Sequence, residues 1–427
     1  MIFDATTSIT ADQPATISSL EASYEDNVLH LKGDVLLEHA LGTMSAEYAE
    51  LKTPIEGASL SDIVLNGRVR LFLQDGAELE CARAELDLHA FNGTLFGEEG
   101  RAVSYIKNDS PAMHVQSQRI DALFQKVQDV YSLKQLRAQK GVSVLYAHDY
   151  SIGADWAVYE KKEGEETFIF YPLEGQLCSV KYKGDELHGK RIDVDLVKKN
   201  IFITDPNATI TSLQGLCRIK CEALLVQQLP RSLTLSQHVH VEHALWGTVE
   251  TEGKMTILSN QLEALGKTKI MYEDRELTCE GRFVLDQDKQ VCHLICDPGH
   301  KLIYQDKDMR ILAERADIQY EKLGNKMQPV HIALTGAVQL QDSRPENARV
   351  ALADRADCDV KTGLTVLFAS SGSPVLFVDT ERNMQMSASE VRIIKDPASG
   401  IETVQGVGCV RFSLTPQETQ LVDFLRN

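Results

Sequence analysis

The stretch that decides the fold reads LHLKGDVLL at residues 29–37. Leucine and valine alternate in it with polar residues, and the same alternation returns at residues 63–73 and through most of the chain. A period of two gives a β-strand one apolar face and one polar face. Gly, Asp and Asn break the alternation at short intervals, as they do between strands. We therefore predict an all-β protein.

Composition and charge limit the classes of function. The chain has 427 residues, of which 43% are hydrophobic, and only 12 are proline, which excludes a disordered or collagen-like protein. The 44 basic and 62 acidic side chains give a net charge of -18, which disfavours binding to nucleic-acid phosphates. No run of 18 or more apolar residues is present, so we expect a protein that is not integral to a membrane.

Turn signals recur along the chain at a regular interval of about 34 residues, which is typical of stacked supersecondary units. Each is followed by another alternating run, so the sequence predicts twelve units. The turn residues are Gly33, Gly67, Gly100, Gly141, Gly175, Asn207, Gln237, Gly266, Gly299, Gly336, Gly372 and Gly406.

A longer repeat lies over the shorter one. EHAL at residues 38–41 returns at 242–245, and the pattern ELxC at 78–81 returns at 276–279. We therefore predict two arrays of six repeats each. The first covers residues 20–229 and the second covers residues 230–427, and they join near Pro230, where proline interrupts a strand pattern.

The last dozen residues are the one stretch with a helical pattern. Thr415, Pro416 and Glu418 fit the N-cap, N1 and N3 positions ahead of an apolar run. A short C-terminal helix and a final strand with a proline kink both fit this segment.

Two segments carry a family resemblance. LHLKGDVLL at 29–37 is followed by SAEYAEL from Ser45, and IALTGAVQL at 332–340 is followed by ADRADCDV from Ala353. This pattern resembles the OstA-like repeat of the lipopolysaccharide-transport bridge family, to which LptA and the periplasmic domain of LptD belong. The resemblance implies a repeated antiparallel two-sheet β-jellyroll, folded like a taco, that holds lipopolysaccharide acyl chains between its sheets. The chain departs from a single bridge protein in having more repeats, and from LptD in having no barrel-forming tail.

The resemblance implies a non-enzymatic carrier that moves lipopolysaccharide or a related glycolipid across the periplasm of a diderm bacterium towards the outer membrane. Its partners would be other envelope bridge proteins, or copies of itself, joined end to end by strand pairing. No signal peptide is present in this sequence, and we expect that one has been removed. Each buried methylene is worth about 0.8 kcal/mol, so an apolar groove would greatly ease the passage of an acyl chain through water.

The residues that we expect to line such a groove are the inward members of the clearest alternating runs. In any β-sandwich these positions also form ordinary core, and that interpretation stays open for each of them. They are Leu29, Leu31, Val35, Leu37, Ile63, Leu65, Val69, Leu71, Leu73, Val239, Val241, Ile270, Tyr272, Ile332, Leu334, Val338, Leu340, Val375 and Phe377.

Histidine and cysteine patterns give no catalytic or metal site. His238, His240 and His243 form the one histidine cluster, which we interpret as a solvated polar face rather than a zinc site. Cys81 and Cys279 occupy matched positions of the two arrays, which favours a buried role for a small side chain. We expect no cofactor.

Two other functions remain open. A β-repeat scaffold or surface protein could bind protein partners by strand-edge pairing without lipid. A carbohydrate-active parallel β-helix would also be all-β, although its coils are usually shorter than 34 residues.

Overall fold

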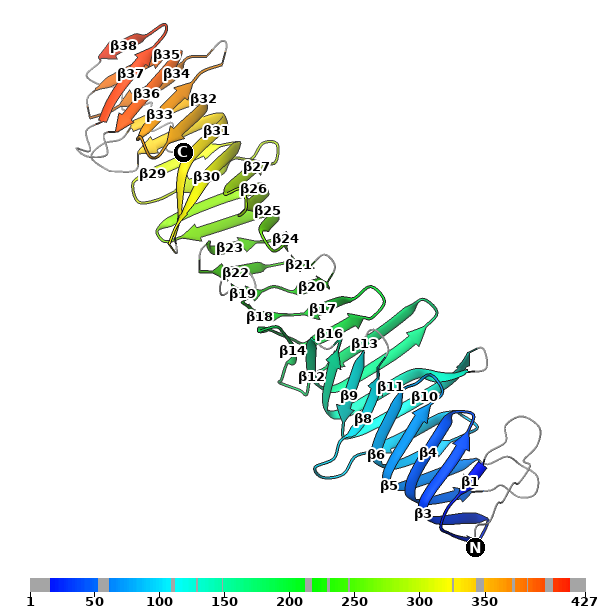
Figure 1. The fold of residues 1–427 in the computed structure, drawn as a ribbon. Coiled ribbons are helices and arrows are strands. Elements are labelled where there is room, and N and C mark those ends of the chain that lie inside the picture. Colours follow the sequence, from blue (N-terminus) through cyan, green and yellow to red (C-terminus); the bar gives the residue numbers. More distant parts are fainter. Residues whose placement is uncertain are drawn as a thin grey trace. The chain divides into compact units, whose positions relative to one another are not determined.

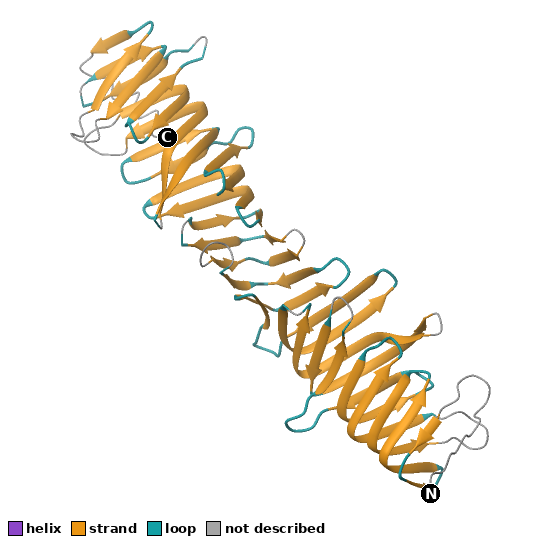
Figure 2. Cartoon of the chain, in the orientation of Figure 1, coloured by secondary structure: helices purple, strands orange, loops and turns teal. Residues whose placement is uncertain are grey.

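The structure is a computed structural model in which every secondary-structure element of the described residues is a β-strand (Figure 2). The predicted C-terminal helix lies outside the described residues. The structure describes residues 16–52, 61–108, 112–127, 130–147, 149–211, 217–228, 231–244, 246–324, 326–342, 349–370, 373–381, 383–395 and 402–414.

The chain divides into two compact units, residues 1–208 and 209–427, with β18 across the boundary. The predicted limits of the two arrays, 20–229 and 230–427, stay predictions.

The first eighteen strands are β1 (Thr16–Ser18), β2 (Glu21–Glu25), β3 (Val28–His39), β4 (Gly42–Lys52), β5 (Asp62–Leu73), β6 (Glu78–Asp87), β7 (Asn92–Phe96), β8 (Val103–Lys107), β9 (Met113–Ser117), β10 (Arg119–Val127), β11 (Val130–Tyr146), β12 (Tyr150–Lys162), β13 (Glu165–Tyr171), β14 (Cys178–Tyr182), β15 (Asp185–Gly189), β16 (Arg191–Asp195), β17 (Asn200–Thr204) and β18 (Asn207–Ile210).

The second unit contains twenty strands among its described residues (Figure 1). They are β19 (Cys217–Lys220), β20 (Ala223–Gln228), β21 (Arg231–Ser236), β22 (Val239–His243), β23 (Gly247–Thr251), β24 (Lys254–Ile257), β25 (Gln261–Tyr272), β26 (Arg275–Asp286), β27 (Val291–Cys296), β28 (Leu302–Gln305), β29 (Met309–Ala313), β30 (Arg315–Leu323), β31 (Lys326–Asp342), β32 (Arg349–Asp359), β33 (Leu364–Phe368), β34 (Val375–Asp379), β35 (Met384–Ala388), β36 (Glu390–Lys395), β37 (Glu402–Val407) and β38 (Arg411–Leu414).

The strand pairings of the second unit form two ladders, and every pairing whose register is described is antiparallel. Ladder A runs β20-β21-β24-β25-β26-β27-β30-β31-β32-β33-β36-β37. Ladder B runs β19-β22-β23-β25-β26-β28-β29-β31-β32-β34-β35-β38. The prediction of an all-β antiparallel repeat fold is confirmed, and the parallel β-helix is wrong for the described strands.

Four long strands belong to both ladders because each changes ladder part-way along its length. In β31, residues 326–335 pair with β30 in ladder A, and residues 339–342 pair with β29 in ladder B. The register shifts between Thr335 and Val338, where Gly336 (φ 83°) and Ala337 (φ 44°) both adopt the left-handed region. A Cβ on Gly336 would lie 2.4 Å from Oε2 of Glu314, so a side chain here would be strained by both φ and contact.

This geometry corrects the interpretation of several predicted turn signals. Gly33, Gly67, Gly141 and Gly336 do not end strands but lie inside β3, β5, β11 and β31. Residues with positive φ form a bulge there, which interrupts the pairing without reversing the chain. The regularly spaced glycines therefore mark two kinds of feature, namely turns between strands and bulges where a long strand changes ladder.

The first unit has the same order of pairings as the second. Each of the strands β5–β17 has its counterpart twenty strands later, so that β7 pairs with β10 as β27 pairs with β30. The broken strands β21 and β22 take the place of β3, and β23 and β24 take the place of β4. The two units therefore share one plan of strand pairing, and their interiors can be compared position by position.

Candidate functional site

An apolar cavity of about 480 Å³ lies between ladders A and B of the second unit. Its volume is within the range of small-molecule sites in proteins. The lining side chains are mostly aliphatic or aromatic, and three charged residues join them. The lining residues are Trp246, Val249, Ile270, Tyr272, Arg275, Glu276, Leu277, Phe283, Leu285, Cys292, Leu302, Tyr304, Asp306, Met309, Ile311, Ala316, Ile318, Tyr320, Met327, Pro329, Ile332, Leu334 and Val360.

Both ladders contribute walls to the cavity. Ile318 and Ile332 are direct partners in β30 and β31 of ladder A, and Tyr304 and Ile311 are direct partners in β28 and β29 of ladder B. All four side chains are half-buried, although they occupy inward positions of their strands. Apolar side chains that stay partly exposed inside a sandwich can still gain burial from a guest.

The cavity has a charged edge formed by Arg275, Glu276 and Asp306. The Tyr304 hydroxyl donates a hydrogen bond to Oδ2 of Asp306 at 2.7 Å, and the backbone N–H groups of Asp308 and Met309 donate to Oδ1 at 2.8 and 2.7 Å. Partial burial alone would raise the pKa of Asp306, but these hydrogen bonds and the nearby Arg275 hold it below its usual value. The edge therefore keeps both signs of charge at neutral pH.

Trp246, one of the lining residues, contacts a histidine. His243 stacks on the Trp246 ring with 3.9 Å between centroids, and its exposed fraction is 5%. The prediction of a solvated face is therefore wrong for His243, because the aromatic neighbour buries it. His238 and His240 do lie on the polar side, where they meet Glu222 at 2.7 Å and Glu250 at 3.0 Å. Among the described residues, no group of three or more His, Cys, Asp or Glu could hold a metal.

Most of the predicted groove residues are buried in the structure. Those that are buried are Leu31, Val35, Leu37, Ile63, Leu65, Val69, Leu71, Leu73, Val239, Val241, Leu334, Val338, Val375 and Phe377. Those that are half-buried are Leu29, Ile270, Tyr272, Ile332 and Leu340. Four of the set line the cavity, namely Ile270, Tyr272, Ile332 and Leu334. Contact of any of them with lipid stays a prediction.

Most residues of the cavity wall are not predicted by the sequence patterns. Leu277, Tyr304, Ile311 and Ile318 lie on strands whose alternation is short or interrupted by charge, so they did not stand out as inward residues. Their matched positions in the first unit follow from the strand pairing of the structure and not from the sequence. Ile318, for example, matches the small residue Ala122 of the first unit. Ile318 is opposite Ile332 in β31, and Ala122 is opposite Leu136 at the matched position of β11.

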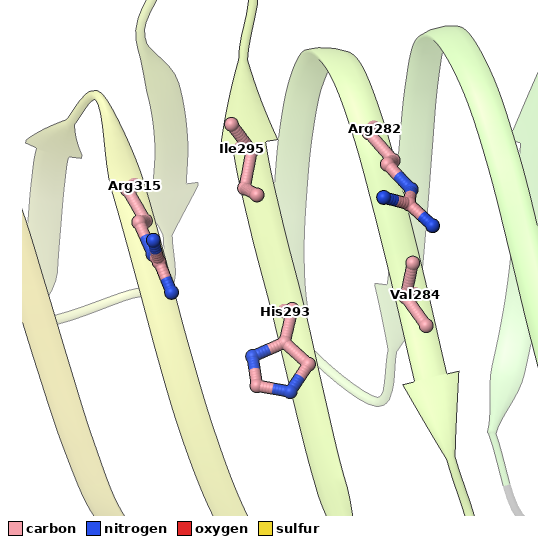
Figure 3. A pocket seen from close by; sticks show the side chains of 5 residues that line it. All are labelled: Arg282, Val284, His293, Ile295 and Arg315. Atoms are coloured by element: carbon pink, nitrogen blue, oxygen red, sulfur yellow. The ribbon is translucent and has the colours of Figure 1, made fainter.

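A second, smaller hollow of about 240 Å³ lies on the outer face of ladder A. Figure 3 shows its five side chains on three strands: Arg282 and Val284 on β26, His293 and Ile295 on β27, and Arg315 on β30. Its basic side chains already have acidic partners. Arg282 meets Glu263 at 2.7 Å, and Asp317 accepts hydrogen bonds from His293 at 2.5 Å and from Arg315 at 2.8 Å. We interpret this hollow as a surface ion-pair network.

Comparison with known proteins gives little. No family model matches the sequence, and no curated protein matches it. One solved structure with some likeness is that of LptH from Pseudomonas aeruginosa, described as "the LptA homologous periplasmic component of the conserved lipopolysaccharide transport device". The match has 8% identity, covers 33% of this chain and 95% of LptH, and has a TM-score of 0.27. A TM-score this low does not establish a shared fold, so the family resemblance stays a prediction.

The described residues include no helix that is long and apolar enough to cross a membrane.

Proposed function

We propose that this chain is a non-enzymatic lipid carrier and that its second unit holds an acyl chain in the cavity between ladders A and B. The observation that carries the proposal is the apolar cavity of about 480 Å³, whose walls include half-buried isoleucines from both ladders. The lipid that we propose is lipopolysaccharide or a related glycolipid, and the compartment is the periplasm of a diderm bacterium.

The apolar walls of the cavity are partly exposed to water. Each methylene of a guest chain that leaves water contributes about 0.8 kcal/mol, and the wall residues that it covers contribute about 25 cal/mol per Å². A filled sandwich offers no such gain, because its side chains already cover one another. A guest chain in the cavity would leave its polar head beside Arg275, Glu276 and Asp306, where water and charge are available.

The ends of the ladders suit the proposed partners. In the described part of the chain, β37 pairs with β36 alone and β38 pairs with β35 alone. Among the described strands of the first unit, β1 and β2 each pair with β3 alone. Strands with one free edge can accept a strand from another molecule, so end-to-end pairing with a second copy or another bridge protein is the proposed mode of association.

The test is photo-crosslinking of the purified full chain with a diazirine-labelled fatty acid, followed by competition with purified lipopolysaccharide. We expect labelled peptides from β25–β31 and loss of most labelling in Ile332→Asp, which puts a charge in the cavity wall. Ile295→Asp is the matched control, because Ile295 is 41% exposed on the outer face of the same ladder, and it should label normally. Absence of labelling in the unaltered chain would overturn the proposal and favour a scaffold that binds protein partners only.

A further inference from the structure

Two cysteines of the second unit lie with their sulfur atoms in contact. The Sγ atoms of Cys279 in β26 and Cys296 at the end of β27 are 3.4 Å apart. Cys279 is 2% exposed, whereas Cys296 is only half-buried. A disulfide has an S–S distance of about 2.05 Å, so a small change in the two side chains would bring the sulfurs to bonding distance.

Backbone hydrogen bonds hold the two residues in this arrangement. Gly281 is opposite Cys296 in the register of β26 and β27, and the N–H of Asp297 donates to the carbonyl of Glu280 at 2.9 Å. Gly281 has φ 149°, and a Cβ there would lie 2.3 Å from the carbonyl oxygen of Ile295, so glycine is needed for this close approach. The proximity of the sulfurs is therefore a consequence of strand register.

The two thiols differ in character. The hydrogen bond to Cys296 and burial raise the pKa of the Cys279 thiol. The hydrogen bond from Cys279 and a backbone hydrogen bond from Glu280 lower the pKa of Cys296. Cys296 is thus the accessible sulfur and the one that ionises first, as an attacking thiolate must be.

We propose that Cys279 and Cys296 form a disulfide when the chain meets a disulfide oxidant, such as oxidised glutathione or the disulfide of a thiol–disulfide oxidoreductase. The Cys296 thiolate attacks one sulfur of the oxidant, whose S–S bond breaks and releases one thiol. Cys279 then loses its proton and attacks Sγ of Cys296, which releases the second thiol. The two cysteines together lose two protons and two electrons, and the oxidant takes up both.

The first unit contains a natural comparison. Cys81 matches Cys279, because Cys81 is opposite Val69 as Cys279 is opposite Thr268. The position that matches Cys296 is Gly97, since Arg83 is opposite Phe96 as Arg282 is opposite Ile295. The first unit therefore has the buried thiol without the second one, and the reaction is confined to the second unit.

Cys292 is the rival partner. It also faces inward from β27, but it is opposite Leu285 and lies four residues before Cys296, about 13 Å along an extended strand. A bond from Cys279 to Cys292 would require β27 to slide along β26, which would break the register.

The disulfide would join β26 to β27 beside the cavity, which Phe283, Leu285 and Cys292 line from these same two strands. It would restrict the unfolded chain between residues 279 and 296. A loop of this length corresponds to a rise of roughly 5 °C or more in the unfolding midpoint of the second unit. This inference does not depend on the proposed lipid, and its test uses none.

The experiment is thiol mapping of the full chain at neutral pH. The reduced protein is incubated with oxidised glutathione, free thiols are alkylated with iodoacetamide, and tryptic peptides are sequenced by mass spectrometry without reduction. We expect the peptide of residues 276–282 linked to that of residues 290–301 through Cys279 and Cys296. Cys296→Ser should lose this link and the rise in midpoint, whereas the control variants Cys81→Ser and Cys292→Ser should keep both. Full alkylation of Cys279 and Cys296 after oxidation, or a link through Cys292, would overturn the proposal.

Discussion

The two units share one order of strand pairing but differ in how deeply some matched inward side chains are buried. Leu136 of β11 and Ile332 of β31 are matched, since Leu136 is opposite Ala122 as Ile332 is opposite Ile318. Leu136 is fully buried with an exposed fraction of 0%, whereas Ile332 is half-buried and lines the cavity. Tyr105 and Tyr304 show the same difference at matched positions of β8 and β28.

Side-chain volume on the neighbouring strands differs in the same direction. In the first unit, Tyr159 is opposite Phe168, and the two rings pack edge to face with centroids 5.9 Å apart. The matched pair of the second unit is Cys358 and Thr365, which are much smaller. Protein interiors fill to near crystal density when the side chains allow it. The comparison teaches that one plan of strand pairing leaves matched inward positions either fully buried or half-buried beside a cavity, according to a few neighbouring side chains.

A second exchange changes the chemistry of the interior. Tyr150 and Tyr182 are direct partners in the first unit, and their rings stack with 4.3 Å between centroids. Arg349 and Asp379 hold the matched positions in the second unit and form an ion pair at 3.1 Å. Asp379 has an exposed fraction of 0%, and Arg349 also pairs with Glu402. An aromatic contact in one unit is thus a buried ion pair in the other.

The largest expected effect comes from a carboxylate placed at the matched inward positions. Leu136→Asp should destabilise the first unit by roughly 4 kcal/mol or more, because an unpaired charge between filled sheets has no partner and no water. Ile332→Asp should cost only about 1–2 kcal/mol, because water reaches this site through the cavity. Hydrogen exchange resolved by peptide measures the two units separately. Equal costs would mean that the cavity is closed in solution.

The next effect is loss of one partner from the buried ion pair. Asp379→Ala should destabilise the second unit by about 3 kcal/mol, because the largely buried Arg349 loses the acidic partner Asp379 and keeps Glu402. The double substitution Arg349→Tyr with Asp379→Tyr copies the first unit and should recover most of that loss. Urea denaturation of the three proteins measures both changes. If the double variant is no more stable than Asp379→Ala, a pair of tyrosines does not pack at these positions of the second unit as it does in the first.

Filling the cavity gives a smaller effect of opposite sign. Thr365→Phe copies Phe168 of the first unit and should stabilise the second unit by about 1 kcal/mol, because it fills space beside Cys358 and Ile332. It should also lower fatty-acid binding about tenfold, measured by titration with a fluorescent fatty acid. The reverse change, Phe168→Thr, should destabilise the first unit by about 3 kcal/mol. If the Thr365→Phe variant binds the fatty acid as tightly as the unaltered chain, the fatty acid does not occupy this cavity.

The strands and the presence of a repeat could be predicted from the sequence, whereas the cavity could not. Alternation at residues 29–37 and 332–340 predicts one buried face, because burial of one face follows from a period of two, and Leu31, Val35, Leu37, Leu334 and Val338 are buried. It does not distinguish Leu136 from Ile332, since both are aliphatic residues in similar runs. Their difference depends on residues such as Phe168 and Thr365, which come near them only after several strands have paired. The sequence predicts turns at the glycines within long strands because positive φ is common to turns and bulges.

The smallest effect concerns acid stability at the charged edge of the cavity. The pKa of Asp306 is held below its usual value in the folded state, so its contribution to stability is present above the unfolded pKa and is lost as the pH falls through the folded pKa. Asp306→Asn should therefore lower stability by less than about 1 kcal/mol at neutral pH, and the difference from the unaltered chain should shrink below a pH of about 4. Asp308→Asn, in the same turn and exposed, is the matched control and should leave the acid limb unchanged. Thermal melts between pH 3 and pH 7 measure the difference, and a constant offset over this range would show that the hydrogen bonds from Tyr304 and the turn do not depend on the Asp306 charge.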